Sequence, residues 1–575
     1  MSEFRSTVPL PPIPDDISIP QFILRSQCTP RPQRPRNVPF FIEDGTGRTL
    51  SYEEVHKRTY NLANGLSIKW DIAPKDVVCL FSPNHMDYAS VIWAVHTLGG
   101  IITQVPANPS YTVDELKHQL SLTSAKLIVA HPSCLRIAKA AARDVGIPDD
   151  CIVLLDAPSS SKQNSQVTLN ELIALGGSQG ENYRAVTFKP GESRTTIAFL
   201  SFSSGTTGKP KAVAVPHYAV IANVIQMATH FRINDPQWPN KRLQPGDVNL
   251  AVLPFFHIYG LIVILHLSLF YGASLVVVPK FSFIDFLRSI VRFKITHLFL
   301  VPPQVVLLCK HPAVKRYNLE HVKFCLSGAA PLSGELMKQI ANVLPNAVIG
   351  QGYGMTETAT TVCMIPPDRK MGTIGSAGEL TPGITARVVK PDGSLANEGE
   401  QGELVVKGPS MALGYYKNPQ ATAESFIDGW VRTGDEVIIK NLEIYVVDRL
   451  KEIMKVRGFQ VAPAELEGHL LLHNDVTDVC VVGIPDDYSG EVPLAFVVRS
   501  AQALARTKDN EAETLRLKKS LQKHVADAKI HYKHLVGGVE FVDAIPKNPS
   551  GKILRRVLRD KAKTLPRQPP VEAKL

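Results

Sequence analysis

The distribution of apolar residues along the chain predicts alternating strands and helices. Two short β-branched runs, DVVCLFS (76–82) and KLIVA (126–130), are typical of buried parallel strands. The segment SYEEVHKRTYNLANGLS (51–67) has its apolar residues at helical spacing. Repeated alternation of this kind predicts a layered α/β architecture.

Residues 249–279 contain no Asp, Glu, Lys or Arg, and the run is long enough to span a bilayer as a helix. Pro254, Gly260 and Gly272 divide it into three pieces, LAVLP, LIVILHLSLF and SLVVV. This pattern favours a buried strand, helix and strand over a membrane span.

The pattern changes after residue 448, where short strands such as VCVVGIPDD and LAFVVR mix with helical segments such as LRLKKSLQKHV. We therefore predict a large N-terminal domain of layered α/β subdomains over 41–448 and a small α+β domain over 449–560. The Pro-rich residues 1–40 are expected to be extended and to wrap the body without entering its core. Residues 561–575 are expected to form a basic tail.

Composition places the 575-residue chain among ordinary globular proteins, with 44% hydrophobic and 20% charged residues. This excludes disordered, collagen-like and coiled-coil chains. The eight cysteines show no CxxC or CxH spacing, so we expect neither a disulfide framework nor a zinc ribbon. Reduced, mostly buried thiols are predicted at Cys28, Cys79, Cys134, Cys151, Cys309, Cys325, Cys363 and Cys480.

The formal net charge of +10 comes mainly from the C-terminal end of the chain. Residues 546–575 hold nine Lys or Arg against Asp560 and Glu572, and the rest of the chain is nearly balanced. Such a tail is typical of a solvated segment or of a contact for a small anionic ligand, and no nucleic-acid motif accompanies it. We therefore expect no nucleic-acid partner.

The two ends of the chain bear on its location. The start, MSEFRSTVPLPPIPDD, lacks the continuous apolar stretch of a secretory signal, so we expect an intracellular protein. The chain closes with Ala573, Lys574 and Leu575, which resemble the peroxisomal S-K-L tripeptide. Chance is the alternative explanation for three residues. We predict a peroxisomal location and an import receptor as partner, with the cytoplasm as the other possibility.

Residues 201–211, SFSSGTTGKPK, follow the apolar run TTIAFL and resemble a phosphate cradle. Small residues let the backbone approach a polyanion, hydroxyl and N–H groups donate to phosphate oxygens, and lysines neutralise charge. The spacing differs from a Walker A loop. A surface turn is the alternative. The candidate phosphate-binding residues are Ser203, Ser204, Gly205, Thr206, Thr207, Gly208, Lys209 and Lys211.

Four further segments accompany this loop: QGYGMTETA (351–359), GWVRTGD (429–435), DRLKEIMKVRGFQVAPAELE (448–467) and PKNPSGKILRR (546–556). Together, and in this order, the five segments resemble the motifs of the adenylate-forming superfamily, most closely those of 4-coumarate:CoA ligase-like enzymes, over residues 40–560. The resemblance implies that a carboxylate attacks the α-phosphate of ATP to give acyl-AMP and pyrophosphate. CoA then attacks the acyl carbon and gives a thioester and AMP. ATP, CoA and Mg²⁺ are thus the implied substrates and cofactor.

The resemblance also assigns roles around the nucleotide. Glu357 is the implied Mg²⁺ ligand, and a hard carboxylate suits a hard cation. Thr356 would contact phosphate, and Tyr353 would stack on adenine. The remaining implied nucleotide contacts are Gly328, Ala329, Gln351 and Gly352 around the adenine, and Asp435 and Arg449 at the ribose.

Lys552 is the implied catalytic residue of the first step, since its ammonium would bridge the carboxylate and the α-phosphate. The alternative is one more solvated lysine in a basic segment, and the flanking Pro-Ser-Gly decides against it. Family members rotate their small domain about a hinge that matches Lys451, so the C-terminal domain is expected to be mobile. The residues implied for the second step are Lys455 and Gln460 beside the adenylate, and Arg457, Gly458 and Lys280 at CoA; relatives usually carry Lys at position 457.

The acid to be activated is the least determined part of the reaction. His257, in LPFFHIYG, matches the position beside the substrate carboxylate, although a core histidine is the alternative. Amino-acid-activating relatives place an Asp in this region to pair with the substrate amine, and residues 248–284 contain none, so the resemblance argues against an amino acid. Val263 stands where coumarate-type enzymes tend to have a small polar residue, so the resemblance implies an apolar acyl chain or an unhydroxylated aryl acid rather than a phenol. The expected pocket residues are His257, Tyr259, Gly260, Val263, Val306 and Ala330.

Two other functions compete with a CoA ligase. A luciferase-like enzyme shares the motifs and adds oxygenation of the adenylate. A non-catalytic nucleotide-binding relative would have lost Glu357 or Lys552, and this chain retains both.

Overall fold

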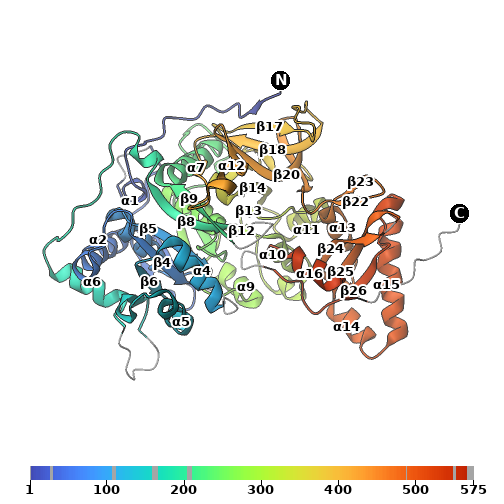
Figure 1. Cartoon of the computed structure of the whole chain (residues 1–575), viewed down its shortest axis with the longest axis horizontal. Coiled ribbons are helices and arrows are strands. Elements are labelled where there is room, and N and C mark those ends of the chain that lie inside the picture. The colour runs from blue at the N-terminus through green and yellow to red at the C-terminus, as the bar shows by residue number, and fades with distance from the viewer. Residues whose placement is uncertain are drawn as a thin grey trace.

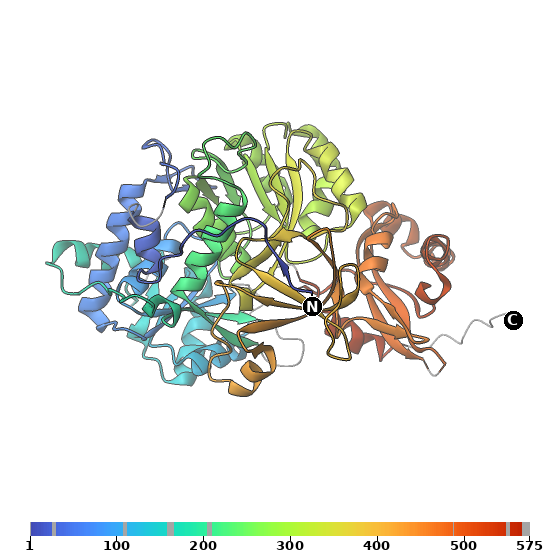
Figure 2. The same cartoon turned by 90° about the horizontal axis from the view of Figure 1, so that it is seen from above.

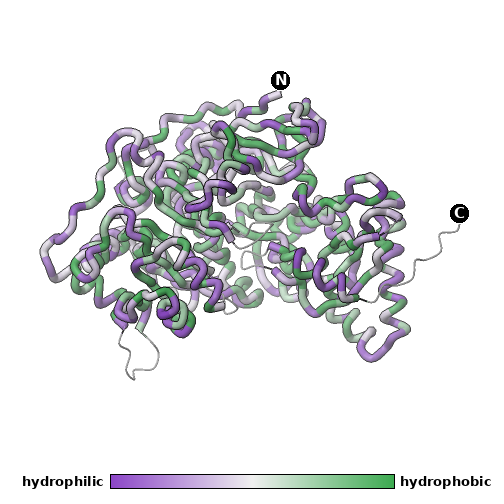
Figure 3. The backbone as a smooth tube through the Cα atoms, viewed as in Figure 1, coloured by the Kyte–Doolittle hydropathy of each residue, from purple (hydrophilic) through white to green (hydrophobic). Residues whose placement is uncertain are grey.

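The computed structural model describes residues 2–25, 30–106, 112–157, 166–203, 210–486, 488–547 and 552–565. These residues form a large N-terminal part and a smaller C-terminal part, which lie side by side in Figures 1 and 2. Figure 3 shows that the interior strands are mostly hydrophobic and the outer turns mostly hydrophilic. The predicted mixed α/β fold is confirmed.

The first sheet of the large part has the strand order β7-β6-β4-β5-β8-β9. Its strands are parallel except for the pair β8 and β9. The strands are β4 (Val77–Ser82), β5 (Ile101–Pro106), β6 (Leu127–Ala130), β7 (Ile152–Leu154), β8 (Ile197–Ser203) and β9 (Lys211–Pro216).

Helices cover both faces of this sheet, as its apolar strands require. One face packs on α2 (Tyr52–Trp70), α3 (Tyr88–Thr97) and α6 (Leu169–Ser178), and the other on α4 (Val113–Thr123) and α5 (Leu135–Val145). Ser51 caps α2 by accepting from the backbone N–H of Glu54, so the predicted helix begins at a capping box.

The second sheet joins a parallel half to an antiparallel half through β14 (Val348–Met355). The parallel half has the order β14-β13-β12-β10-β11-β2, and β3 pairs antiparallel at its edge. Its other strands are β2 (Phe41–Glu43), β3 (Thr49–Leu50), β10 (Val248–Ala251), β11 (Ser274–Val277), β12 (His297–Leu300) and β13 (Phe324–Ser327). The helices of this region are α7 (His217–His230), α8 (Ser268–Tyr271), α9 (Phe283–Arg292), α10 (Pro302–Lys310) and α11 (Gly334–Val343).

The antiparallel half runs in the order β1-β17-β18-β20-β21-β16-β15 toward β14. Its strands are β1 (Phe4–Arg5), β15 (Thr360–Met364), β16 (Gly378–Leu380), β17 (Thr385–Val389), β18 (Gln401–Lys407), β19 (Phe426–Ile427), β20 (Trp430–Lys440) and β21 (Glu443–Arg449), with α12 (Pro419–Ser425) before β19.

The apolar run over residues 249–279 forms β10, the π-helix η4 (Tyr259–Leu267), α8 and β11. Every residue of η4 is buried, and the run belongs to the main core. The prediction of a buried strand, helix and strand is therefore confirmed. Among the described residues, no helix combines the length and apolar character needed to cross a membrane.

The small part is built on a sheet of β22 (Met454–Val456), β23 (Phe459–Val461), β24 (Val476–Asp486), β25 (Gly490–Arg499) and β26 (Gly538–Phe541). One face packs on α13 (Pro463–Leu470) and α15 (Glu511–Ala526), and the other on α16 (Arg555–Ala562). The helix α14 (Ala501–Thr507) precedes α15. The last strand of the large sheet ends at Arg449, and the first strand of the small part begins at Met454. The predicted boundary between residues 448 and 449 therefore lies at the last residue of β21, and the domain bounds remain a prediction.

The N-terminal segment departs from its prediction. It runs along the outside of the large part, and β1 pairs with β17 (Figure 1). However, α1 (Ile19–Leu24) buries Ile19, Phe22 and Ile23 in the main core. The expectation that residues 1–40 stay out of the core is therefore wrong for this helix. Its apolar residues 19, 22 and 23 share one helix face, which packs on the core. The side-chain oxygen of Gln21 accepts a hydrogen bond from the Ser18 N–H and so stabilises the start of the helix.

The cysteine prediction is confirmed for the part of the chain that the structure describes. All seven cysteines in it are free, and five of them are buried. Burial raises the pKa of the Cys325 thiol to about 12, so this group stays protonated and unreactive at neutral pH.

Candidate functional site

A cavity of about 770 Å³ lies where the two sheets of the large part meet the small part. The carboxyl ends of β8, β13 and β14 reach it, as expected for ligand sites in parallel sheets. Its lining includes residues of all five motif segments or their flanks: Ser203, Pro210 and Lys211; Gly352, Tyr353, Thr356 and Glu357; Arg432, Thr433 and Gly434; Arg449 and Lys451; and Lys547, Lys552 and Leu554.

Glu357 lies in this cavity and is held by two hydroxyl groups. Its Oε1 accepts from Ser203 Oγ at 3.1 Å and from the Tyr415 hydroxyl at 2.8 Å. The Glu357 residue is only 5% exposed. Lys211 Nζ lies 4.8 Å from the centre of the Tyr415 ring, so Tyr415 contacts both the acidic and the basic member of the site.

Tyr415 was not predicted from the sequence, where it stands in GYYKNP between two motif segments. Burial and the nearby Glu357 carboxylate raise the pKa of the Tyr415 phenol, so it donates its proton to the carboxylate at neutral pH. Only the fold brings the loop after β18 against Glu357. No local pattern in the sequence marks this tyrosine.

The residues around Glu357 suit a cation that is shared with a nucleotide. Among the described residues, no three His, Cys, Asp or Glu side chains are grouped to hold a metal ion. Mg²⁺ is commonly bound through one or two carboxylates together with substrate phosphates, so a single buried carboxylate beside the phosphate-binding candidate Ser203 fits it.

A second polar cluster joins Tyr353, Asp435 and Arg449. The Tyr353 hydroxyl donates to Asp435 Oδ2 at 2.6 Å, and Arg449 Nε lies 3.4 Å from Asp435 Oδ1. Asp435 and Arg449 are directly paired on β20 and β21, which fixes their separation. Burial raises the pKa of Asp435, and Arg449 and Tyr353 oppose this rise.

The small part contributes Lys552 to the same cavity. Burial is the main effect that lowers the pKa of the Lys552 ammonium to about 8, and the positive charge of Arg449 adds to it. The carboxylates of Glu452, Asp435 and Glu357 act in the opposite direction and favour the charged form. Lys451, the predicted hinge, also lines the cavity between β21 and β22. The structure therefore places Lys552 with the nucleotide-binding candidates.

The turn before η4 forms an apolar wall of the cavity together with β13 and β15. Burial, and less strongly the charge of Lys552, lower the pKa of His257 to about 4, so its imidazole is neutral at pH 7. His257 Nδ1 accepts from the Tyr259 N–H at 3.3 Å. The apolar lining residues on this side are Phe256, Ile258, Val263, Leu326 and Met364.

Gly328, Ala329 and Gly352 line the cavity as the adenine candidates. A Cβ at Gly328 would come within 3.0 Å of the Tyr259 ring, so the absence of a side chain keeps that ring close to the backbone. Gln351 does not line the cavity. Its buried side-chain oxygen accepts a hydrogen bond from the Leu332 N–H at 2.7 Å, so Gln351 holds the backbone at Leu332 and does not face the cavity.

Several predicted residues lie outside the cavity lining. Val306 is buried elsewhere in the core, and Ala330 and Lys280 are exposed. Gly260 faces the backbone, because a Cβ there would lie 2.0 Å from the Pro254 carbonyl oxygen. The roles expected for these residues remain predictions.

Apart from Lys280, the residues expected to act in the second step lie on the β22–β23 hairpin, outside the cavity lining. Lys455 and Gln460 are directly paired there, and the Gln460 side chain accepts from Gln401 of β18 at 3.0 Å. Arg457 and Gly458 form the hairpin tip, and both have positive φ angles. The remaining candidates lie outside the described residues: Ser204, Gly205, Thr206, Thr207, Gly208 and Lys209 of the loop, and Ala573, Lys574 and Leu575 at the end of the chain.

Comparisons with known proteins agree with this fold. A family model described as AMP-binding enzyme matches residues 26–416, and one described as AMP-binding enzyme C-terminal domain matches residues 465–552. The chain therefore belongs to the AMP-binding enzyme family, and the resemblance to adenylate-forming enzymes is confirmed.

Relatives match over nearly their whole length. The chain is 36% identical to the acyl-CoA ligase AFT1-1 of Alternaria alternata, with 96% of each chain covered. It is 35% identical to 4-coumarate–CoA ligase 3 of Arabidopsis thaliana, with 97% of this chain and 94% of that one covered. The crystal structure of the anthranilate CoA ligase AuaEII with anthranoyl-AMP has the same fold, with a TM-score of 0.82 at 21% identity over 96% of this chain and 98% of that one.

Proposed function

We propose that the protein is an AMP-forming acid–thiol ligase, which converts a carboxylic acid, ATP and CoA into an acyl-CoA, AMP and pyrophosphate. Family membership supports this, as do the names of relatives that cover nearly the whole chain. The observation that carries the proposal is the meeting of Lys552, Glu357 and Tyr353 in one cavity, because Lys552 comes from segment 546–556 of the small part, whereas Glu357 and Tyr353 come from segment 351–359 of the large part.

The first step brings two anions together. The substrate carboxylate attacks the α-phosphorus, and pyrophosphate leaves as its bond to that phosphorus breaks. Negative charge in such a transition state is stabilised by fixed cations and hydrogen-bond donors, without a protein nucleophile. Lys552 supplies a compact positive charge to the carboxylate and the α-phosphate, and Lys211 supplies one at the triphosphate.

Mg²⁺ is proposed as the cofactor, held by Glu357 and by phosphate oxygens. When bound, it neutralises charge on the leaving pyrophosphate. Ser203 and Tyr415 orient the Glu357 carboxylate for this role by occupying its Oε1.

In the second step the thiol of CoA attacks the acyl carbon of the adenylate, and AMP leaves. Lys455, Gln460 and Arg457 are proposed to serve this step. Since they lie outside the cavity while Lys552 lies in it, the present arrangement corresponds to the first step. The second step then requires rotation of the small part about Lys451.

The substrate is proposed to be an acid with an apolar acyl or aryl group. The cavity wall beside His257 is formed by the apolar side chains of Val263, Leu326 and Met364. These side chains carry no charge that could pair with a substrate amine or with a second carboxylate. The neutral His257 adds a hydrogen-bonding group without adding charge.

The C-terminal Ala-Lys-Leu supports a proposed peroxisomal location and an import receptor as partner. A fusion of the last residues to a reporter protein tests this. Peroxisomal import that is lost when Leu575 is removed supports the proposal, and a cytoplasmic reporter contradicts it.

The activity is tested by ATP-dependent AMP release with cinnamic, phenylacetic and medium- to long-chain fatty acids, with and without CoA. We expect at least one acid to stimulate AMP release and to yield its thioester when CoA is present. Absence of stimulation by every acid contradicts the ligase. Oxygen uptake or light emission with an acyl substrate indicates the luciferase-like alternative.

The role of Lys552 is tested by Lys552→Ala. We expect acyl-AMP formation to fall at least about 100-fold, because the charge that bridges the two anions is removed. Thioester formation from supplied acyl-AMP should be spared. Lys561→Ala changes an exposed lysine of α16 and serves as the control. Retained adenylation in Lys552→Ala contradicts the assignment.

A further inference from the structure

The loop that follows β4 connects the first sheet to the wall of the cavity through one buried amide. The Asn84 side chain, in a residue that is 5% exposed, donates from Nδ2 to the carbonyl oxygens of Ala251 and Leu253, at 2.9 Å each. Its Oδ1 accepts from the Phe255 N–H at 2.8 Å. The Nδ2 donors and the Oδ1 acceptor of this amide thus all form hydrogen bonds with the backbone of residues 251–255, which begin at the end of β10 of the second sheet.

The segment that Asn84 holds carries the acid-side wall. It begins at the end of β10 and leads through Phe256 and His257, which both line the cavity, into η4. The His257 N–H donates to the Pro254 carbonyl at 3.1 Å, so the turn is closed on itself. The position of these lining side chains is therefore set by a backbone that Asn84 contacts three times.

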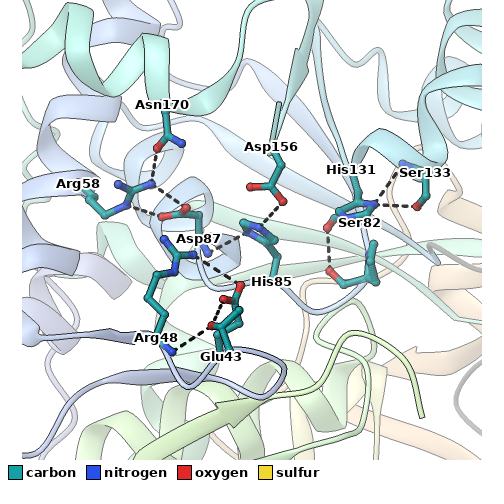
Figure 4. A network of polar contacts seen from close by, with 12 residues as sticks. Glu43, Arg48, Arg58, Ser82, His85, Asp87, His131, Ser133, Asp156 and Asn170 are labelled. Carbon is teal, nitrogen blue, oxygen red and sulfur yellow. Dashed lines mark hydrogen bonds and ion pairs between the residues drawn. The ribbon is translucent and has the colours of Figure 1, made fainter. Parts of the chain in front are cut away.

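The loop around Asn84 is fixed on its other side by a network of charged groups (Figure 4). Arg58 of α2 donates to both carboxylate oxygens of Asp87, at 2.6 and 2.7 Å. His85 Nε2 lies 3.0 Å from Asp156, and its Nδ1 accepts from the Asp87 N–H at 3.1 Å. Bidentate Arg–carboxylate pairs restrict geometry strongly, so the loop is a rigid support.

We infer that Asn84 is a positioning residue for the acid-binding side of the cavity. It touches no substrate and acts through the turn at residues 253–257. The reason is geometric: the turn follows β10 of the second sheet, and Asn84 ties it to the first sheet, so loss of the amide frees the backbone that carries Phe256 and His257. This inference rests on the proposed function, because it assumes that an acid occupies that side.

The chain offers a matched control in Asn64 of α2. Asn64 is 3% exposed, donates to the carbonyl oxygens of Gly176 and Gly180 at 2.9 and 3.0 Å, and accepts from the Asn182 N–H at 2.7 Å. It thus makes the same three kinds of bond, but it joins α2 to the end of α6 and does not line the cavity. Loss of either amide leaves comparable buried backbone groups unpaired.

The experiment compares Asn84→Ala with Asn64→Ala by pyrophosphate exchange, with cinnamate, phenylacetate and octanoate as the acids. We expect Asn84→Ala to raise the KM for the acids at least 10-fold, to change their order of kcat/KM, and to leave the KM for ATP within about twofold. Asn64→Ala should lower the melting temperature similarly without changing the order of the acids. Equal acid KM values and an unchanged order in the two variants overturn the inference.

Asn84→Asp and Asn64→Asp provide a second pair if an alanine variant does not fold. The carboxylate introduced by Asn84→Asp keeps an acceptor for the Phe255 N–H and lacks the amide donors, so a smaller rise in acid KM, of about threefold or more, is expected for this variant alone. A wild-type enzyme that is inactive with every acid contradicts the proposed function. An active wild type with equal effects in both variants contradicts only the role of Asn84.

Discussion

At position 552 burial and the charge of Arg449 lower the pKa of the lysine, whereas acidic neighbours oppose this change. Lys552 lies in a part of the cavity where Arg449 is near, and its pKa is lowered to about 8. A lysine that remains protonated at neutral pH under these conditions is suited to approach an anionic substrate, because the bound anions relieve an unfavourable environment. The sequence predicted the role of this residue through its motif, but not the lowered pKa.

The pKa of Lys552 predicts how adenylation depends on pH. Since the ammonium is charged below about pH 8 and neutral above it, the kcat/KM of acid-dependent pyrophosphate exchange for ATP, which reports the free enzyme, should fall as the pH rises through about 8. A guanidinium keeps its charge at high pH, so Lys552→Arg should lack this decline although it is slower. Measurement from pH 6 to 9.5 checks this, and an identical decline in both enzymes contradicts it.

At the scale of elements, α16 and the segment that carries Lys552 are held by one arginine. Arg555 donates to Glu452 Oε2 at 2.8 Å and to Glu467 Oε2 at 2.6 Å. Glu452 follows the predicted hinge, and Glu467 lies in α13, where its Oε1 accepts from the Val481 N–H at 2.8 Å. Arg555 thus ties Lys552 to the hinge and to the core of the small part.

Arg555→Leu should therefore destabilise the small part. Removing one partner of a buried ion pair leaves a carboxylate uncompensated and costs about 3–5 kcal/mol. Burial raises the pKa of Glu467, and Arg555 opposes this rise, so the variant should also bind a proton there. Urea unfolding of the full chain measures the loss, with Arg556→Leu, an exposed neighbour, as the control. Equal stability of the two variants contradicts the anchoring role.

The helical stretch after His257 shows how far patterns predict an element. The apolar run correctly predicted a buried helix between two strands. It did not predict that residues 259–267 form a π-helix, because all of them are buried and an evenly apolar run has no periodic face. The π-helix begins where Gly260 packs on the Pro254 carbonyl. Only the folded turn before the helix brings these two residues together.

At the scale of the whole molecule, the proposed function assigns the present arrangement of the two parts to the first of two steps. Lys552 lies in the cavity, whereas Lys455 and Gln460 lie on a hairpin outside its lining. Gly468 of α13 meets the large part at Ser333, the N-cap of α11, where a Cβ on Gly468 would lie 3.2 Å from the Ser333 Cβ. This contact is close to the Cβ separation of a disulfide, about 3.5–4.5 Å.

The double variant Ser333→Cys/Gly468→Cys should lock this arrangement when oxidised. We expect the oxidised protein to retain acid-dependent pyrophosphate exchange and to lose thioester formation at least 10-fold, because the small part cannot rotate. A reductant should restore the second step. Each single variant under oxidising conditions is the control. Full thioester formation in the cross-linked protein contradicts the need for rotation.

The sequence by itself determined the strands and helices whose apolar residues repeat locally, the two-part organisation, the family, and the chemical types in the site. These follow from neighbours along the chain, since periodicity and motif spacing are local properties. Only the tertiary structure decided that Tyr415 and Ser203 meet on Glu357, that Asn84 supports the turn of His257, and that α1 is buried. Such contacts join residues far apart in the chain, and they depend on how complete sheets and helices pack against one another.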